Sequence, residues 1–168
     1  GPTYEDVDPV RFVGNRSSGR MGLAVATEAV SRGARVVLIL GPCGLAPPRG
    51  VEVFRVRSSE EMRVEVLHRA GEADAVIMAA AVADYTVDGG PQQTKLAKDR
   101  QRLTLTLTRT VDILAELGRW RGSREHPVLV GFAAETHDLV SRARTKLRKK
   151  AVDLVVANDV SRADAGFE

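Results

Sequence analysis

The sequence has few aromatic residues, a single cysteine and almost no excess of either charge. Aromatic side chains make up 4% of its 168 residues, and 25 lysines and arginines face 22 aspartates and glutamates, for a net charge of +3. A nucleic-acid binder needs a basic surface and stacking platforms, so this composition argues against that class. Anionic small molecules remain candidate ligands.

Long apolar runs and metal-ligand patterns are also missing. No run approaches the about 20 residues of a membrane-spanning helix, and the N-terminus lacks a basic-then-apolar signal pattern. Cys43 has no partner for an internal disulfide, and the three histidines share no metal-ligand spacing. We therefore expect a soluble, cytoplasmic protein.

Hydrophobic residues make up 43% of the chain, enough for one domain spanning residues 1–168. Short β-branched runs alternate with helix-period segments. This alternation predicts an α/β fold, a Rossmann-like, mostly parallel doubly wound sheet with helices on both faces. The predicted strands are 35–40, 51–56, 75–82, 103–108, 128–134 and 153–158, the fourth of them antiparallel or at an edge. The predicted helices begin near residue 20, at 58 with a Ser58/Glu61 capping box, at 112 and at 139.

One stretch, residues 15–22 (NRSSGRMG), joins an extended segment to the first helix pattern. Its glycines, hydroxyls and free backbone N–H groups would lie at a helix N-terminus, which attracts anions. Arg16 and Arg20 add positive charge that can bind phosphate oxygens. The alternative interpretation is an ordinary Ser-capped helix with a loop glycine.

Other candidate residues follow predicted strands. Asp84 comes after the apolar run 75–82, and Phe132 lies near the end of 128–134, while Lys146 and Lys150 share one helix face. Ligands of open α/β sheets bind beyond the carboxyl ends of the strands, so these residues and the Asn15 loop are expected at one edge of the sheet. Each also has an ordinary explanation as a turn cap, a core residue or a solvated face. The aperiodic loop 87–100, which carries Lys95 and Lys98, is predicted to be mobile or a lid.

Seven segments together resemble phosphopantothenate–cysteine ligase, the synthetase domain of the bacterial bifunctional coenzyme A biosynthesis protein. The resemblance extends over nearly the whole chain, in order. The segments are GPTYE (1–5), DPVR (8–11), NRSSGRMG (15–22), AAAVADY (79–85), KLAK (95–98), GFAAET (131–136) and ANDVS (157–161).

The resemblance implies a homodimer, CTP and Mg²⁺, and two half-reactions through an acyl-cytidylate. It implies that Asn15 holds the intermediate during attack by cysteine, that Lys95 acts in that second step and that Arg11 supports Asn15 or the substrate. Gly19 would lie against phosphate, beside an anion site formed by Ser17, Ser18 and Arg20. The implied cytidine contacts are Ala79, Ala80, Asp84 and Phe132, and the triphosphate contacts are Lys146 and Lys150, with Lys95 also near the nucleotide.

Several alternatives stay open. The family resemblance implies that a first strand, C-terminal elements and a fused flavin-dependent decarboxylase domain lie outside this segment. An ATP-using relative exists on the same plan, so the residues alone do not choose the base. One alternative is a nicotinamide-dependent oxidoreductase, but no G-x-G-x-x-G motif follows a predicted strand in this sequence. Another is a non-catalytic nucleotide-binding protein, which would bind CTP without turnover.

Overall fold

The computed structural model describes residues 1–97, 101–135 and 139–159. It divides into two compact units, which we describe separately. Unit 1 comprises Gly1–Met62 and Ala80–Val111, and unit 2 comprises Arg63–Ala79 and Asp112–Glu168. Among the described residues, no helix is both long and apolar enough to cross a membrane.

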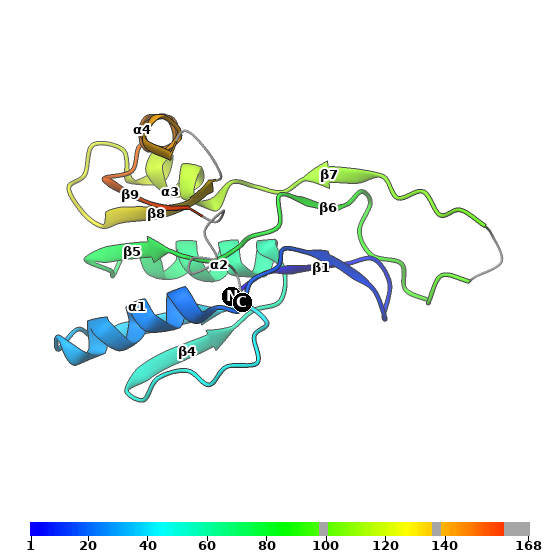
Figure 1. Ribbon diagram of the computed structural model, residues 1–168, viewed down its shortest axis with the longest axis horizontal. Helices are drawn as coiled ribbons and strands as arrows, with labels where there is room; N and C mark the ends of the chain where they lie inside the picture. Colours follow the sequence, from blue (N-terminus) through cyan, green and yellow to red (C-terminus); the bar gives the residue numbers. More distant parts are fainter. Residues whose placement is uncertain (98–100, 136–138, 160–168) are drawn as a thin grey trace. The chain divides into compact units, whose positions relative to one another are not determined.

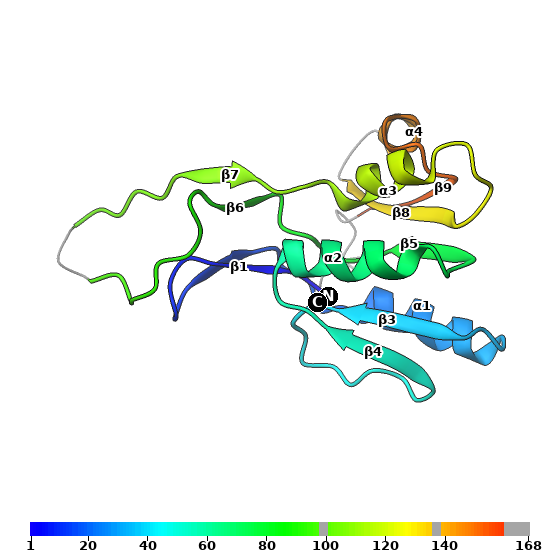
Figure 2. The same ribbon diagram turned by 180° about the vertical axis from the view of Figure 1, so that it is seen from behind.

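Unit 1 contains two antiparallel ribbons and one parallel pair (Figure 1). The first ribbon joins β1 (Tyr4–Asp6) to β2 (Phe12–Gly14), and the second joins β6 (Tyr85–Val87) to β7 (Leu107–Arg109). The parallel pair is β3 (Val36–Leu40) with β4 (Val51–Arg55). Helix α1 (Arg20–Ser31) lies against β3, as Figure 2 shows, and ends as predicted before Gly33, which has φ 84°.

Unit 2 contains a three-stranded parallel sheet in the order β5–β8–β9. Its strands are β5 (Ala75–Met78), β8 (Val128–Glu135) and β9 (Leu154–Asp159). Helices α3 (Ile113–Arg121) and α4 (Leu139–Lys150) pack on β8 and on each other. Leu117 and Leu129 are fully buried, and Gly131 has no side chain to keep Leu114 of α3 from packing on β8.

Helix α2 (Ser59–Ala70) begins in unit 1, and its N-terminus follows the predicted spacing. Ser58 Oγ accepts the Glu61 N–H at 3.1 Å, while the Glu61 carboxylate accepts the Arg57 N–H at 2.6 Å. The capping box is therefore confirmed on the serine side. On the glutamate side, the carboxylate binds one residue earlier than the standard box.

The predicted α/β class with mostly parallel strand pairs is confirmed, and two boundaries were wrong. The predicted strand 75–82 ends at Met78, because the chain then leaves β8 and Ala81 pairs in parallel with Pro2. Of the predicted strand 103–108, only Leu107 and Thr108 belong to β7, since the preceding residues pair with no other strand among the described residues. The β1–β2 ribbon was not predicted.

Candidate functional site

The N-terminus of α1 in unit 1 carries no side-chain cap. Its N-cap is Gly19, in the left-handed region at φ 80°, which has no side chain to accept a hydrogen bond from the first turn. Ser17 and Ser18 instead accept the N–H groups of Gly19 and Arg20 at 3.4 and 3.5 Å. The N-cap position is thus a glycine, Ser18 accepts one long hydrogen bond from the first helical residue, and the other N–H groups of the first turn are left for an anion.

Gly19 is required at this position for two reasons. L-residues rarely adopt its φ, and an added Cβ would lie 3.3 Å from Gly1 Cα and 3.4 Å from Cys43 Cβ. Arg16 and Arg20, on either side, are exposed. The loop thus combines a tightly packed backbone with two accessible guanidinium groups.

Asn15 precedes this loop and is exposed, but its amide is fixed. Its Nδ2 donates to Val82 O at 2.9 Å. No described residue donates a hydrogen bond to its Oδ1, so that oxygen and the second amide hydrogen remain for a ligand. Asn15 is thereby held beside the segment 79–84 that follows β5.

That segment is itself held in place from two sides. Thr3 Oγ1 accepts the Ala83 N–H at 2.9 Å, and Thr110 donates its hydroxyl to Ala83 O at 2.6 Å and its N–H to Asp84 O at 3.0 Å. Asp84 is exposed at the end of the segment. Unit 1 thus holds Asn15 and Asp84 at one fixed backbone segment, which also includes Ala80.

Arg11 binds the residue that follows Lys95 and is itself held by Asp8. Arg11 Nη2 donates to Leu96 O at 3.0 Å, next to Lys95, and its Nε lies 3.6 Å from Asp8 Oδ2. Burial raises the pKa of Asp8, but backbone N–H groups of Val10, Leu96 and Arg11 and the Arg11 charge hold it below its usual value. Within the described part of the chain, Arg11 forms no hydrogen bond with Asn15.

In unit 2 the two predicted lysines of α4 are half-buried and paired. Lys146 Nζ donates to the carbonyl oxygen of Phe132, and Lys150 Nζ lies 2.9 Å from Asp112 Oδ2. Burial raises the pKa of Asp112, whereas Lys150, the Ala115 N–H and Lys146 lower it more, so the carboxylate stays ionised. Unit 2 therefore brings Phe132, Lys146 and Lys150 together.

Sequence reasoning assigned no site role to Asp8 and Asp112, which organise the predicted residues. Asp112 caps α3 through Ala115 N–H as well as pairing with Lys150, and an Asp before a helix pattern is a recognisable signal. An Asp-Pro pair in a turn is the corresponding signal for Asp8. The motif residues Lys98, Thr136 and Ser161 lie outside the described residues.

The described ranges hold no group of three His, Cys, Asp or Glu side chains that could bind a metal ion. Such a set is not required for magnesium at nucleotide sites, where the ion is bound largely by substrate phosphates and water.

Parallel βα units, an uncapped helix N-terminus and paired lysines define a Rossmann-like α/β protein suited to anionic ligands. Over residues 1–168 the chain matches the family described as DNA/pantothenate metabolism flavoprotein C-terminal domain. The chain belongs to this family.

Named relatives agree. The chain is 49% identical over 171 residues to the coenzyme A biosynthesis bifunctional protein CoaBC of Bacillus subtilis (strain 168), across 99% of this chain and 40% of the relative. It is thus similar to a part of that protein and spans about 40% of the length of the curated relatives it matches.

Two solved structures have the same fold. One is the C-terminal domain of a CoaBC protein, with 40% identity and a TM-score of 0.81, covering 98% of this chain and 79% of that one. The other is the DNA/pantothenate metabolism flavoprotein from Streptococcus pneumoniae, with 25% identity and a TM-score of 0.83, covering 96% and 80%. The predicted Rossmann-like class and the family resemblance are confirmed.

Proposed function

We propose that this chain joins 4′-phosphopantothenate to cysteine as the ligase part of coenzyme A biosynthesis. Family membership and the similarity to CoaBC support the pathway. The observation that carries the chemistry is the exposed Asn15 amide, held by Val82 O beside the uncapped start of α1. A fixed donor next to a phosphate-binding backbone suits a reaction of an acyl phosphate ester.

The reaction needs an activated carboxylate, because a carboxylate oxygen is a poor leaving group. A carboxylate oxygen of phosphopantothenate attacks the α-phosphorus of CTP, and pyrophosphate leaves. The cysteine amine then attacks the acyl carbon of the acyl-cytidylate, CMP leaves, and the amine loses a proton. Both steps place several negative charges together, so neutralising groups must be arranged beforehand.

The residues divide this work by their chemistry. The α1 N-terminus with Gly19, Ser17, Ser18 and Arg20 binds a phosphate. Asn15 holds the acyl-cytidylate while cysteine attacks, and Lys95 acts in the same step with support from Arg11. The groups proposed to bind the nucleotide are Ala79, Ala80, Asp84 and Phe132 at the cytidine and Lys146 and Lys150 at the triphosphate.

The finer points of the proposal are CTP as nucleotide, Mg²⁺ bound by its phosphates, a cytoplasmic location, and fusion to a flavin-dependent decarboxylase in the whole protein. We also propose a homodimer. Leu103, Leu105 and Leu107 occupy alternate positions of the chain leading into β7 and are 56%, 38% and 40% exposed, more than such side chains usually are. A second copy would cover them.

The test is pyrophosphate release with Mg²⁺ and 4′-phosphopantothenate, comparing CTP with ATP, with and without cysteine. Release that needs CTP and phosphopantothenate but not cysteine supports the acyl-cytidylate step. CTP binding without release would favour a non-catalytic protein, and stabilisation by NADPH but not CTP would favour an oxidoreductase.

Asn15→Asp tests the residue that carries the proposal. The carboxylate cannot donate to Val82 O and adds negative charge beside anions, so we expect CTP binding to persist while product formation falls about 100-fold or more. A variant with unchanged product formation would remove Asn15 from the mechanism.

A further inference from the structure

The turn between β1 and β2 holds the segment that carries Lys95. Gln92 N–H donates to Val7 O at 2.9 Å, and Leu96 N–H donates to Asp8 Oδ2 at 3.1 Å. Arg11 Nη2 donates to Leu96 O at 3.0 Å. Both backbone polar groups of Leu96 are thus bound by side chains of one turn, an arrangement that we call the Leu96 clamp.

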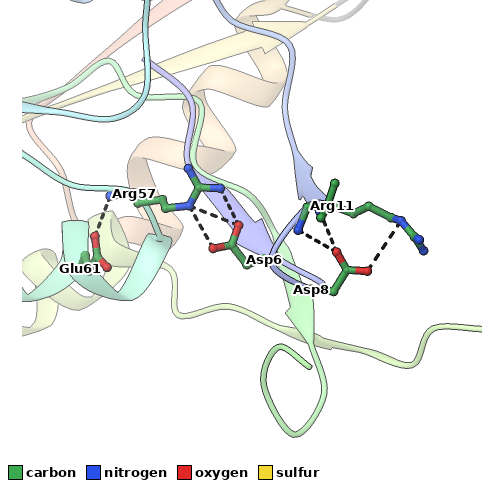
Figure 3. Close-up of polar contacts among 6 residues, drawn as sticks. Asp6, Asp8, Arg11, Arg57 and Glu61 are labelled. Atoms are coloured by element: carbon green, nitrogen blue, oxygen red, sulfur yellow. Dashed lines mark hydrogen bonds and ion pairs between the residues drawn. The ribbon is translucent and has the colours of Figure 1, made fainter. Parts of the chain in front are cut away.

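Asp8 is the centre of this clamp. Asp8 is 2% exposed, and its Oδ1 accepts the N–H groups of Val10 and Arg11 at 2.8 and 2.9 Å. The other oxygen therefore remains for Leu96, with the Arg11 guanidinium beside it (Figure 3). A turn of this kind would form with Oδ1 alone, so the contact of Oδ2 with a residue 88 positions away is an additional feature.

The ribbon that presents Asp8 is itself fixed next to the turn, at the last residue of β1. Arg57 binds both carboxylate oxygens of Asp6 at 2.7 to 3.2 Å, and its own N–H binds Glu61 at the start of α2 (Figure 3). Tyr4 and Phe12 stack across the ribbon with ring centroids 3.8 Å apart. Asp8 therefore acts from a braced support rather than from a loose loop.

We propose that Asp8 is a positioning residue for Lys95, acting through the Leu96 clamp. Lys95 itself is exposed and lies in a segment without helix or strand, so its own surroundings do not fix it. Because the N–H and the carbonyl oxygen of Leu96 are both bound, the backbone of Lys95, one residue earlier, is restricted in where it can lie. This inference rests on the proposed ligase function only for the chemical step that Lys95 serves.

Asp8→Asn is the sharpest perturbation, because it keeps the shape of the side chain. The asparagine oxygen can still accept the two turn N–H groups, but its NH₂ faces the Leu96 N–H, so one donor meets another and the charge beside Arg11 is lost. Arg11→Lys is the second variant. Its shorter side chain keeps a charge near Asp8 but cannot reach Leu96 O.

Hydrogen exchange at the Leu96 amide tests the clamp without any activity measurement. We expect exchange about tenfold faster or more in Asp8→Asn than in the wild type, because a charge-assisted bond is lost. Asp88→Asn is the matched control, since it makes the same change at an exposed residue near the start of the same loop, and it should exchange like the wild type. Unchanged exchange in Asp8→Asn overturns the proposal.

Turnover then tests positioning. If exchange at Leu96 is faster in Asp8→Asn, we expect the kcat of this variant to fall about 10- to 100-fold while its KM for CTP stays within about twofold of the wild type. In a Lys95→Gln background, Asp8→Asn should have almost no further effect on kcat. Unchanged kcat, or effects that multiply in the double variant, would show that Asp8 does not act through Lys95. If Asp8→Asn folds poorly, Arg11→Lys takes its place in the test and should give the same fall in kcat. An inactive wild type would refute the ligase function, and the positioning role with it, while the exchange result still decides whether the clamp exists.

Discussion

Replacing Gly118 with alanine should destabilise this protein, although the same change usually stabilises a helix. Gly118 lies in the middle of α3, where alanine would ordinarily add about 0.5–1 kcal/mol of stability. Here an added Cβ would overlap the carbonyl oxygen of Lys150 and lie 3.0 Å from Lys150 C and 3.2 Å from Ala151 O. Backbone atoms cannot rotate away, so α3 and the end of α4 would have to separate.

The net effect follows from these opposing terms. Overpacking of a closely packed contact costs about 1–3 kcal/mol, which exceeds the gain in helix propensity. Because the overlap is severe and with backbone, the cost lies at the upper end of that range. We therefore expect a net loss of about 2 kcal/mol in the free energy of unfolding, close to 4–8 °C in Tm for a chain of this size. Because Lys150 would move away from Asp112, CTP affinity should fall as well under the proposed function.

Thermal unfolding of Gly118→Ala beside Gly71→Ala provides the assay. Gly71 is the matched control in the same unit, since its added Cβ would meet only the Trp120 ring, at an ordinary 3.9 Å. Its Tm should stay within about 2 °C of the wild type. A Gly118→Ala protein as stable as the wild type, or more stable, would refute the close approach of α3 to the end of α4.

Three further predictions concern unit 2. Arg121→Met should lower the free energy of unfolding by about 2–4 kcal/mol in a denaturant titration, because this buried guanidinium binds Asp153 and the carbonyl oxygens of Pro127 and Ala151; a loss below about 0.5 kcal/mol would contradict this. The hydrogen bonds and charge of Arg63 outweigh desolvation and lower the pKa of Glu116. This pair therefore contributes stability above about pH 4.3, and the contribution is lost as pH falls through the native pKa. We expect the Tm of Glu116→Gln to be lower than that of the wild type at pH 7. The Tm of the variant should also depend less on pH between 5 and 3. An unchanged slope would show that the pair does not form. Lys150→Met should weaken CTP binding about tenfold by calorimetry, whereas the exposed Lys149→Met should change it less than about twofold; equal effects would argue against Lys150 as a phosphate ligand.

Several elements could be predicted because their signals are local. Twelve-residue helices such as α4 repeat their apolar positions over more than two turns, and the strands β3 and β8 are apolar, largely β-branched runs with clear boundaries. Asp112 as a cap and Gly33 as a stop signal depend on a few neighbouring residues. The helix start at residues 15–22 was found for the same reason.

The short ribbons could not be predicted in this way. Strands β1 and β2 have three residues each, too few to show a period, and they form because Tyr4, Phe12 and Arg57 meet across the fold. The end of β5 at Met78 depends on which strand offers hydrogen bonds next, which no local pattern encodes.

For the candidate site, the sequence by itself determined which chemical groups are present and on which elements most of them lie. The tertiary structure alone decided their partners, because Asn15 with Val82 and Asp8 with Leu96 are 67 and 88 positions apart. Periodicity, caps and turn residues act over about four residues. Contacts between distant segments form only when packing brings their backbones together, so the partners of Asn15 and the support of Lys95 had to be found in the fold.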